Sequence, residues 1–336
     1  MPRAHHNDVE LFRKAHSSIL GFQLLFLYKP HHSNNNQPMR LPLLFAASAL
    51  LCVSLHAQQL PSAITIDPAP DKANPAAIET FQIPSHGAML NALAYVATGA
   101  GPHPVVILLH GFPGNEKNLD LAQTIRRAGW DVLYFDYRGS WGSPGDFSFT
   151  HSIEDTQSAI AYLRDPANAK KLRADPGYIV LIGHSMGGFM ALQAGANDPA
   201  IKAIVTISAA DFNAGRLQSL PPDKRDATVN ELATHLAAEG MAPLAGCTPE
   251  SLAREVIANA AKWDFLSLVP KLATRPMLVL TSDDGLAPVN DALVEALHRA
   301  GNTHVTAIHI ATDHSYSDHR IALQQAVLQA LDSLQK

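Results

Sequence analysis

The pentapeptide Gly183-His184-Ser185-Met186-Gly187 decides the fold. It comes directly after the apolar run Tyr178-Ile179-Val180-Leu181-Ile182 and directly before a helix-like stretch, Gly188 to Asn197. This order predicts a strand, a sharp turn and a helix, with Ser185 at the apex. A serine on such a turn has a strained backbone and an exposed hydroxyl, and glycines on both sides carry no Cβ atoms that would collide there. We therefore expect Ser185 to be a nucleophile.

Apolar, β-branched segments alternate with longer amphipathic segments along the rest of the chain. The segment Val105-Val106-Ile107-Leu108-Leu109 is apolar throughout, as strands buried on both faces of a parallel sheet are. The alternation predicts an α/β fold, with a mostly parallel eight-stranded sheet, helices on both faces and an antiparallel edge formed by the first two strands. The expected strands are 78–83, 89–97, 104–109, 131–136, 178–183, 203–208, 277–282 and 305–310. The expected helices are 116–128, 151–164, 187–197, 288–300 and 318–334.

Residues 211–270 interrupt this alternation. They follow the strand that ends near Ser208 and contain two helix-like stretches, 229–239 and 249–261. An insertion at this point lies near the strand ends where open α/β sheets bind ligands. We interpret it as a helical cap. The alternative is that its helices pack on the edge of the sheet.

A serine hydroxyl becomes nucleophilic when a histidine removes its proton and a carboxylate orients that histidine. The pair Asp283-Asp284 follows the strand that begins at Met277, and His314 follows the strand that begins at Val305. Both positions are C-terminal strand ends. The sequence therefore offers a serine, an acid and a base in that chain order.

From about residue 78 to its end, the chain resembles the α/β-hydrolase superfamily, in particular the branch of serine aminopeptidases, acyl-peptidase-like enzymes and esterases. The serine turn, the acid and the base occur in the order typical of that family. The resemblance selects Asp284, four residues before Pro288, as the acid, and Asp283 stays an alternative. The sequence carries no dinucleotide fingerprint or P-loop, so no cofactor is expected.

For the base, the resemblance selects His314 in the loop after the last strand. His309 lies inside that strand, and His319 is expected to open the final helix and is the better reserve. Together with Asp313 and Asp318, these histidines show no recognised metal-ligand spacing. We therefore expect no metal site.

The oxyanion of a tetrahedral intermediate needs two backbone N–H donors. Met186, directly after the nucleophile, is the first expected donor. The segment His110-Gly111-Phe112-Pro113-Gly114 resembles the family's His-Gly signature. Phe112 is the expected second donor, because Pro113 has no N–H. We expect His110 to brace this loop and not to transfer a proton.

The segment from Phe135 to Gly145 resembles a loop that holds the rim of the active site in this family. We expect Arg138 to brace it by pairing with a carboxylate such as Asp136. The alternative is that the Arg138 guanidinium binds a substrate carboxylate. His184 and Trp141 are further candidates for the wall of the pocket.

The expected activity is that of a serine hydrolase, which cleaves a carboxylic ester or an amide through an acyl-enzyme; the ester is favoured. An exopeptidase would use the same residues but would need acidic groups for a free α-amine. The inserted region offers six of them: Asp223, Asp226, Glu231, Glu239, Glu250 and Glu255. A binding protein on the same scaffold is the third hypothesis, although such proteins usually lack one of the catalytic residues.

The first 75 residues differ from the rest. Met39 and Arg40 precede an apolar segment, 41–57, that is typical of a secretory signal peptide cleaved after Ala57. Met39 is therefore the expected true start, and residues 1–38 are interpreted as an upstream extension without a fold. An uncleaved membrane anchor is the alternative, although the segment is short for a span. Residues 58–75 are interpreted as a linker and 76–336 as the hydrolase domain. The expected location is secreted or periplasmic.

Composition narrows the possible partners. The 336 residues carry a formal net charge of −5 without a dense Lys/Arg cluster, which argues against nucleic acid as a partner. The chain has two cysteines, Cys52 and Cys247, and Cys52 lies in the expected signal peptide, so no internal disulfide is expected. The expected partner is a small-molecule ester or peptide substrate, with no stable membrane partner after signal cleavage.

Overall fold

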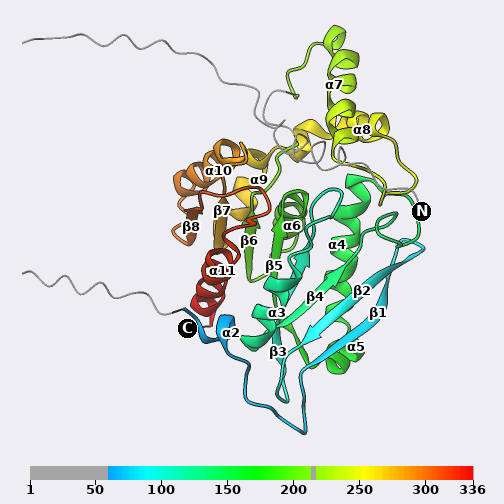
Figure 1. The fold of residues 1–336 in the computed structure, drawn as a ribbon. Coiled ribbons are helices and arrows are strands. Elements are labelled where there is room, and N and C mark those ends of the chain that lie inside the picture. Colours follow the sequence, from blue (N-terminus) through cyan, green and yellow to red (C-terminus); the bar gives the residue numbers. More distant parts are fainter. Residues whose placement is uncertain (1–59, 213–216, 336) are drawn as a thin grey trace, which may run out of the picture. The chain divides into compact units, whose positions relative to one another are not determined.

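The computed structural model describes residues 60–212 and 217–335 (Figure 1). Its centre is an eight-stranded sheet in the order β1-β2-β4-β3-β5-β6-β7-β8. The first two strands pair antiparallel with each other, β2 is antiparallel to β4, and the remaining pairs are parallel. The predicted fold class and all eight strands are confirmed. The strands are β1 (Ala77–Ser85), β2 (Ala88–Val96), β3 (His103–Leu109), β4 (Asp131–Phe135), β5 (Ala174–His184), β6 (Ala203–Ile207), β7 (Met277–Thr281) and β8 (Val305–His309).

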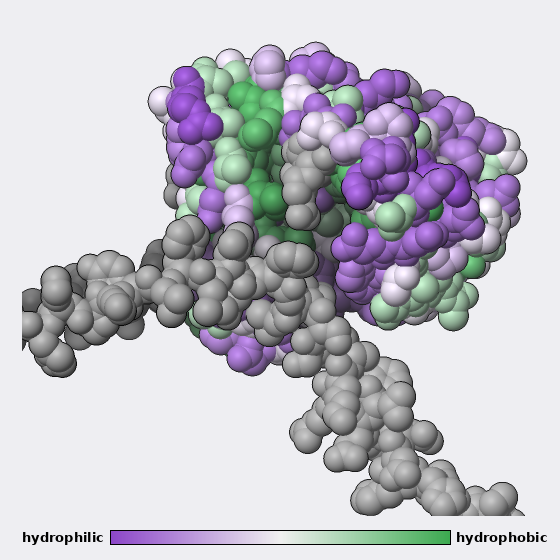
Figure 2. All heavy atoms as spheres, turned by 90° about the horizontal axis from the view of Figure 1, so that it is seen from above, coloured by the Kyte–Doolittle hydropathy of each residue, from purple (hydrophilic) through white to green (hydrophobic). Residues whose placement is uncertain are grey.

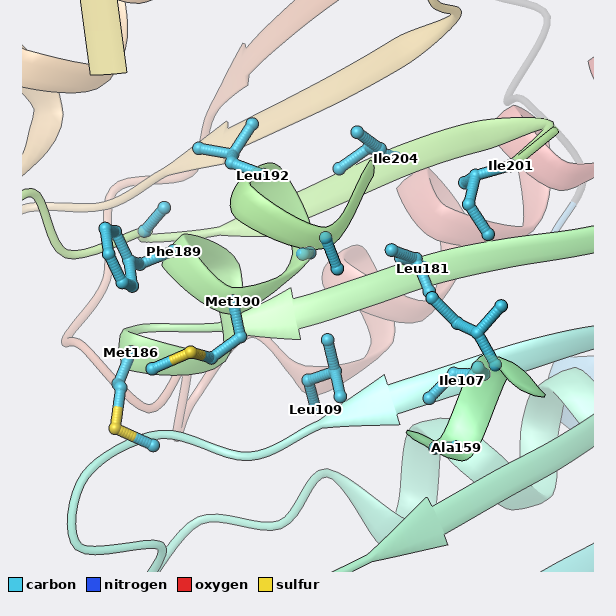
Figure 3. Packing of buried hydrophobic residues seen from close by; sticks show 14 of the residues in the cluster. Ile107, Leu109, Ala159, Leu181, Met186, Phe189, Met190, Leu192, Ile201 and Ile204 are labelled. Atoms are coloured by element: carbon cyan, nitrogen blue, oxygen red, sulfur yellow. The ribbon is translucent and has the colours of Figure 1, made fainter. Parts of the chain in front are cut away.

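The central strands are buried on both faces, as their apolar sequences predict. In β3, Ile107 and Leu109 belong to one hydrophobic core and Val106 and Leu108 belong to the other, because successive side chains of a strand point to opposite faces. Figure 3 shows residues of β3, β5, β6, α4 and α6 in the first core. The main helices of this core are α4 (Phe149–Arg164), α6 (Met186–Asn197), α9 (Phe265–Leu272) and α10 (Ala287–Arg299), and the main helices of the second core are α3 (Leu119–Arg127) and α11 (Arg320–Leu334).

Three short helices were not expected. α2 (Ser62–Thr65) lies in the segment interpreted as a linker, and its Ala63 is buried in the core beneath α3 and α11. α5 (Pro166–Leu172) follows α4 directly, with Asp165 as its N-cap. α9 contains Pro270, and a proline inside a helical pattern usually marks a helix end.

The insertion divides into parts with different burial. η1 (Pro222–Lys224) leads into α7 (Arg225–Ala238), which buries only Val229. α8 (Pro249–Trp263) buries one face in the first core, through Leu252, Val256 and Trp263 among others. In Figure 1, α7 and α8 lie at the upper end of the sheet, and α7 points away from it. α9 completes the interval as a core helix that packs on α6 and α10.

The predicted signal peptide, its start at Met39 and the upstream extension lie outside the described residues. Within residues 60–212 and 217–335, no helix combines the length and the apolar character that a membrane crossing requires.

Asp131 begins β4 at the end of the sheet opposite to Ser185. Its side chain is buried and accepts a hydrogen bond from the Ala97 N–H at 2.8 Å. Burial raises its pKa to about 7, against the opposing effects of that hydrogen bond and of Arg173. An unfolded chain would ionise this carboxyl near pH 4. The stability that the neutral carboxyl contributes is therefore present below pH 4 and lost as the pH rises through 7.

Replacing Asp131 by Asn removes this dependence on pH. The change in the free energy of unfolding caused by Asp131→Asn should depend on pH. We expect this change to be more favourable at pH 8 than at pH 5 by about 2–4 kcal/mol. Urea denaturation of both proteins at the two pH values measures the difference. Glu295→Gln is the control, because Glu295 is exposed and makes only a surface pair with Arg299. An equal effect of Asp131→Asn at both pH values would contradict the prediction.

Candidate active site

Ser185 occupies the turn between β5 and α6, with φ 57° and ψ −122°. Its N–H donates to the Ile207 carbonyl at 2.9 Å, and its carbonyl accepts the Ala210 N–H at 3.1 Å. A Cβ atom on Gly183 would lie 2.0 Å from the Gly187 oxygen, and one on Gly187 would lie 2.1 Å from the Leu109 oxygen. Both glycines are therefore required by close packing of the backbone, as the sequence predicted.

Asp284 and His314 meet at the C-terminal ends of β7 and β8. The Asp284 Oδ2 lies 2.7 Å from the His314 Nδ1, and the Asp284 side chain is 2% exposed. Burial raises the pKa of Asp284, but hydrogen bonds from His314, the Leu286 N–H and Ser208 have a larger effect in the opposite direction. Together these effects lower the pKa to about 2. The carboxylate is thus ionised at neutral pH and orients the imidazole.

His184 places His314 beside the serine turn. The His184 Nε2 lies 2.8 Å from the His314 carbonyl oxygen, and the two ring centroids are 4.7 Å apart. Burial, with a contribution from His314, lowers the pKa of His184 to about 3. The ring is therefore neutral and donates its Nε2–H to that carbonyl. Among the described residues, the Ser185 hydroxyl makes no hydrogen bond with His314, a contact that often tightens only when substrate binds.

The alternative acid and bases have other partners. Asp283 lies 3.1 Å from the His309 Nε2, and the His309 Nδ1 is 3.0 Å from the Thr281 hydroxyl. The reserve base, His319, pairs with the exposed Asp318 at 2.8 Å. The geometry therefore brings together Asp284 and His314, and it places Asp283, His309 and His319 in separate pairs. No set of side chains within 60–212 and 217–335 forms a metal-ligand group.

The expected oxyanion loop lies against the serine. A Cβ atom on Gly111 would be 3.0 Å from the Ser185 Cβ and 3.5 Å from its Oγ, so a side chain at this position would press on the serine. Burial lowers the pKa of His110 to about 4, and its Nδ1 lies 2.8 Å from the Gly111 carbonyl, contacts that suit a residue bracing the loop. Met186 is the first residue of α6, and a helix leaves its first N–H groups unpaired.

The rim loop is fixed on two sides. The Trp141 indole donates to the Pro113 carbonyl at 2.7 Å, which joins this loop to the oxyanion loop. The backbone of Gly139 and Phe147 exchanges hydrogen bonds of 2.8 and 2.9 Å with Ala245 of the insertion. The insertion is therefore attached directly to the rim of the site.

The predicted partner of Arg138 was wrong. Its Nε lies 2.7 Å from the Oδ1 of Asp155 on α4, and it also pairs with Glu154. Asp136 instead contacts Lys117 at 3.1 Å and accepts a hydrogen bond from the Tyr134 hydroxyl at 2.7 Å. Asp155 is fully buried, so the guanidinium turns toward α4 to compensate that charge. The arginine braces the loop, but from the side of the helix.

Sequence reasoning missed an aromatic cluster that begins at the oxyanion loop. Within it, Phe112 and Phe212 are half-buried and the other rings are buried. Neighbouring ring centroids are 4.4–6.4 Å apart, which suits edge-to-face and offset contacts. No spacing along the chain could reveal it, because its members come from five separate segments. They are Phe112, Phe147, Phe149, Phe189, Phe212, Trp263 and Phe265.

The fold agrees with comparison to known proteins. A family model for the alpha/beta hydrolase fold matches residues 104–319. The chain belongs to this family. The narrower branch of aminopeptidases, acyl-peptidase-like enzymes and esterases stays a prediction.

Two solved carboxylesterases share this fold with the chain. The thermostable carboxyl esterase of Bacillus coagulans has a TM-score of 0.58 at 14% identity, over 77% of this chain and 99% of that one. The carboxylesterase EstE1, from a metagenomic library, has a TM-score of 0.57 at 20% identity, over 82% and 93%. The quorum-quenching protein AidA of Acinetobacter baumannii (strain MDR-ZJ06) is 28% identical over 131 residues. That match spans 37% of this chain and 41% of AidA.

Proposed function

We propose that this alpha/beta hydrolase family member is a serine hydrolase that cleaves carboxylic esters. Ser185 is the nucleophile, His314 the general base and Asp284 the acid that orients it. The observation that carries the proposal is the 2.7 Å contact between Asp284 and the His314 Nδ1. The His314 ring in turn lies against the ring of His184, the residue before the strained serine. A binding protein without activity would not need this pair together with a strained serine turn.

The proposed reaction follows from these positions. His314 takes the hydroxyl proton on its Nε2 as the Ser185 Oγ attacks the carbonyl carbon, and Asp284 stabilises the imidazolium that forms. The N–H groups of Phe112 and Met186 hold the oxyanion. The imidazolium then gives its proton to the leaving alcohol, and water releases the acyl group by the same steps in reverse.

The acidic residues of the insertion favour an ester over a peptide with a free α-amine. Glu255 is bound to the backbone of α4, and Glu250 and Asp226 pair with Arg254. The remaining three candidates, Asp223, Glu231 and Glu239, are exposed on or beside α7. Three of the six carboxylates are thus already engaged and the other three are exposed, whereas the expected oxyanion loop carries the half-buried ring of Phe112.

We also propose that the enzyme acts outside the cytoplasm. The support is the sequence of residues 39–57, which has the basic start, apolar core and small final residue of a secretory signal. Sequencing the N-terminus of protein recovered from a secreting host tests this, and a mature chain that begins at Gln58 is expected.

A substrate panel tests the activity. We expect the chain to hydrolyse p-nitrophenyl esters faster than aminoacyl p-nitroanilides. The same catalytic residues would cleave both substrates, but only the anilide has a free α-amine, which needs an acidic subsite. Ser185→Ala is expected to lower ester kcat at least 10³-fold with an unchanged circular dichroism spectrum. An active Ser185→Ala variant would refute the serine mechanism, and faster anilide cleavage would favour the exopeptidase hypothesis.

A further inference from the structure

We propose that Glu255 is a positioning residue for substrate selection. Carried on the insertion helix α8, its carboxylate holds the start of α4 and thereby fixes an aromatic surface beside Ser185 that receives an apolar acyl group. The inference rests on the proposed ester hydrolysis. It adds that the insertion controls recognition of the acyl portion of the ester.

The Glu255 carboxylate makes three contacts with the first turn of α4. Its Oε2 accepts the Phe149 N–H at 3.0 Å, and its Oε1 accepts the Thr150 N–H at 2.8 Å and the Thr150 hydroxyl at 2.6 Å. The side chain of the N-cap, Ser148, accepts only the His151 N–H. Glu255 therefore satisfies two N–H groups that the helix itself leaves unpaired, and its charge is favourable at a helix N-terminus.

The helix residue held in this way, Phe149, lies against two half-buried rings, Phe112 of the expected oxyanion loop and Phe212. Its fully buried ring lies 5.9 Å from Phe112 and 4.4 Å from Phe212. Phe112 is the expected oxyanion donor. Phe212 comes two residues after Ala210, whose N–H binds the Ser185 carbonyl. Phe112 thus follows Gly111, which packs closely on Ser185, Phe212 follows a residue bonded to Ser185, and both rings lie against Phe149.

The surface formed by these rings indicates the class of acyl group. Phe112 and Phe212 are carbon surfaces, and aromatic rings favour an aromatic or compact apolar group in offset or edge contact. Seen from above in Figure 2, the upper end of Figure 1 carries a band of hydrophobic residues between hydrophilic regions. An ester of benzoic acid should therefore depend on the surface formed by Phe112 and Phe212 more than an ester of acetic acid does, because the methyl group of acetate is too small to span the two rings.

Loss of Glu255 should be a local change, because the insertion has other attachments. The Ala245 contacts with the rim loop remain, and α8 keeps Leu252 and Val256 in the core. Glu250 provides a matched control, since it lies on the same helix but only pairs with the exposed Arg254.

The test compares p-nitrophenyl benzoate and p-nitrophenyl acetate in the full-length wild type, Glu255→Ala, Glu255→Gln and Glu250→Ala. We expect Glu255→Ala to raise KM for the benzoate about 5- to 20-fold, while KM for the acetate changes by less than about 2-fold. Glu255→Gln keeps one acceptor oxygen and should restore part of the benzoate affinity. Glu250→Ala should match the wild type. Should Glu255→Ala fail to fold, Glu255→Gln carries the comparison.

Two outcomes would overturn the inference, and they are distinguishable from failure of the proposed function. Equal changes for both esters would show a merely structural role, and unchanged kinetics in an active Glu255→Ala enzyme would show no role. A wild-type chain that hydrolyses neither ester and does not react with a fluorophosphonate would instead overturn the proposed function, and this inference with it.

Discussion

Replacing Asp284 by Asn is expected to lower kcat for a p-nitrophenyl ester on the order of 10⁴-fold. The pKa of Asp284 is about 2, so the group is a carboxylate throughout the assay range. An amide cannot stabilise the imidazolium as a carboxylate does, and its NH₂ group favours the tautomer with the proton on the wrong nitrogen. Steady-state kinetics at pH 8 measure the loss.

The neighbouring aspartate supplies the matched control. Asp283 differs from Asp284 by one position and pairs with the exposed His309 at 3.1 Å. We expect Asp283→Asn to keep kcat within about 2-fold of the wild-type value, since the pair of Asp283 and His309 lies outside the proposed catalytic triad. Comparable losses in both variants, or full activity in Asp284→Asn, would refute the assignment of the acid.

The second large effect concerns stability. Arg138→Met is expected to lower the free energy of unfolding by about 3–5 kcal/mol, because it leaves Asp155 buried without its cation. Asp155 is fully buried, burial raises its pKa, and its remaining partners are the Ser85 hydroxyl at 2.6 Å and the Arg138 backbone N–H at 2.8 Å. Guanidinium denaturation followed by tryptophan fluorescence measures the change.

Two comparisons separate this effect from loss of a surface pair. Arg254→Met removes the exposed pair with Glu250 and should leave the free energy of unfolding close to that of the wild type. The double variant Arg138→Met/Asp155→Leu should recover part of the lost stability, because the uncompensated charge is removed. Similar losses in Arg138→Met and Arg254→Met would contradict the structural role of the buried pair.

The fold could be predicted because its signals are local. The apolar run Val105–Leu109 and its counterparts mark strands buried on both faces, and the amphipathic segments between them mark helices. Two short core helices escaped detection. α5 has seven residues, too few for a clear period, and α9 contains Pro270. Packing against α6 and α10 outweighs that unfavourable signal in α9.

The candidate site could be predicted only where a motif carried it. The serine turn, Asp284 and His314 have recognisable positions after strands, and the structure places the last two 2.7 Å apart. The partner of Arg138 was not visible, because Asp155 lies 17 residues away on a buried face of α4. The role of Glu255 depends on a contact across 106 positions. Such pairings are decided by tertiary packing.

Active-site labelling tests the central claim most directly. The full chain is treated with a fluorophosphonate, digested and mapped by mass spectrometry. The proposed mechanism predicts one adduct, on the peptide that contains Ser185, and its loss in Ser185→Ala and after heat denaturation. Absence of labelling in the folded protein, or an adduct that persists in Ser185→Ala, would contradict the claim that this serine is the nucleophile.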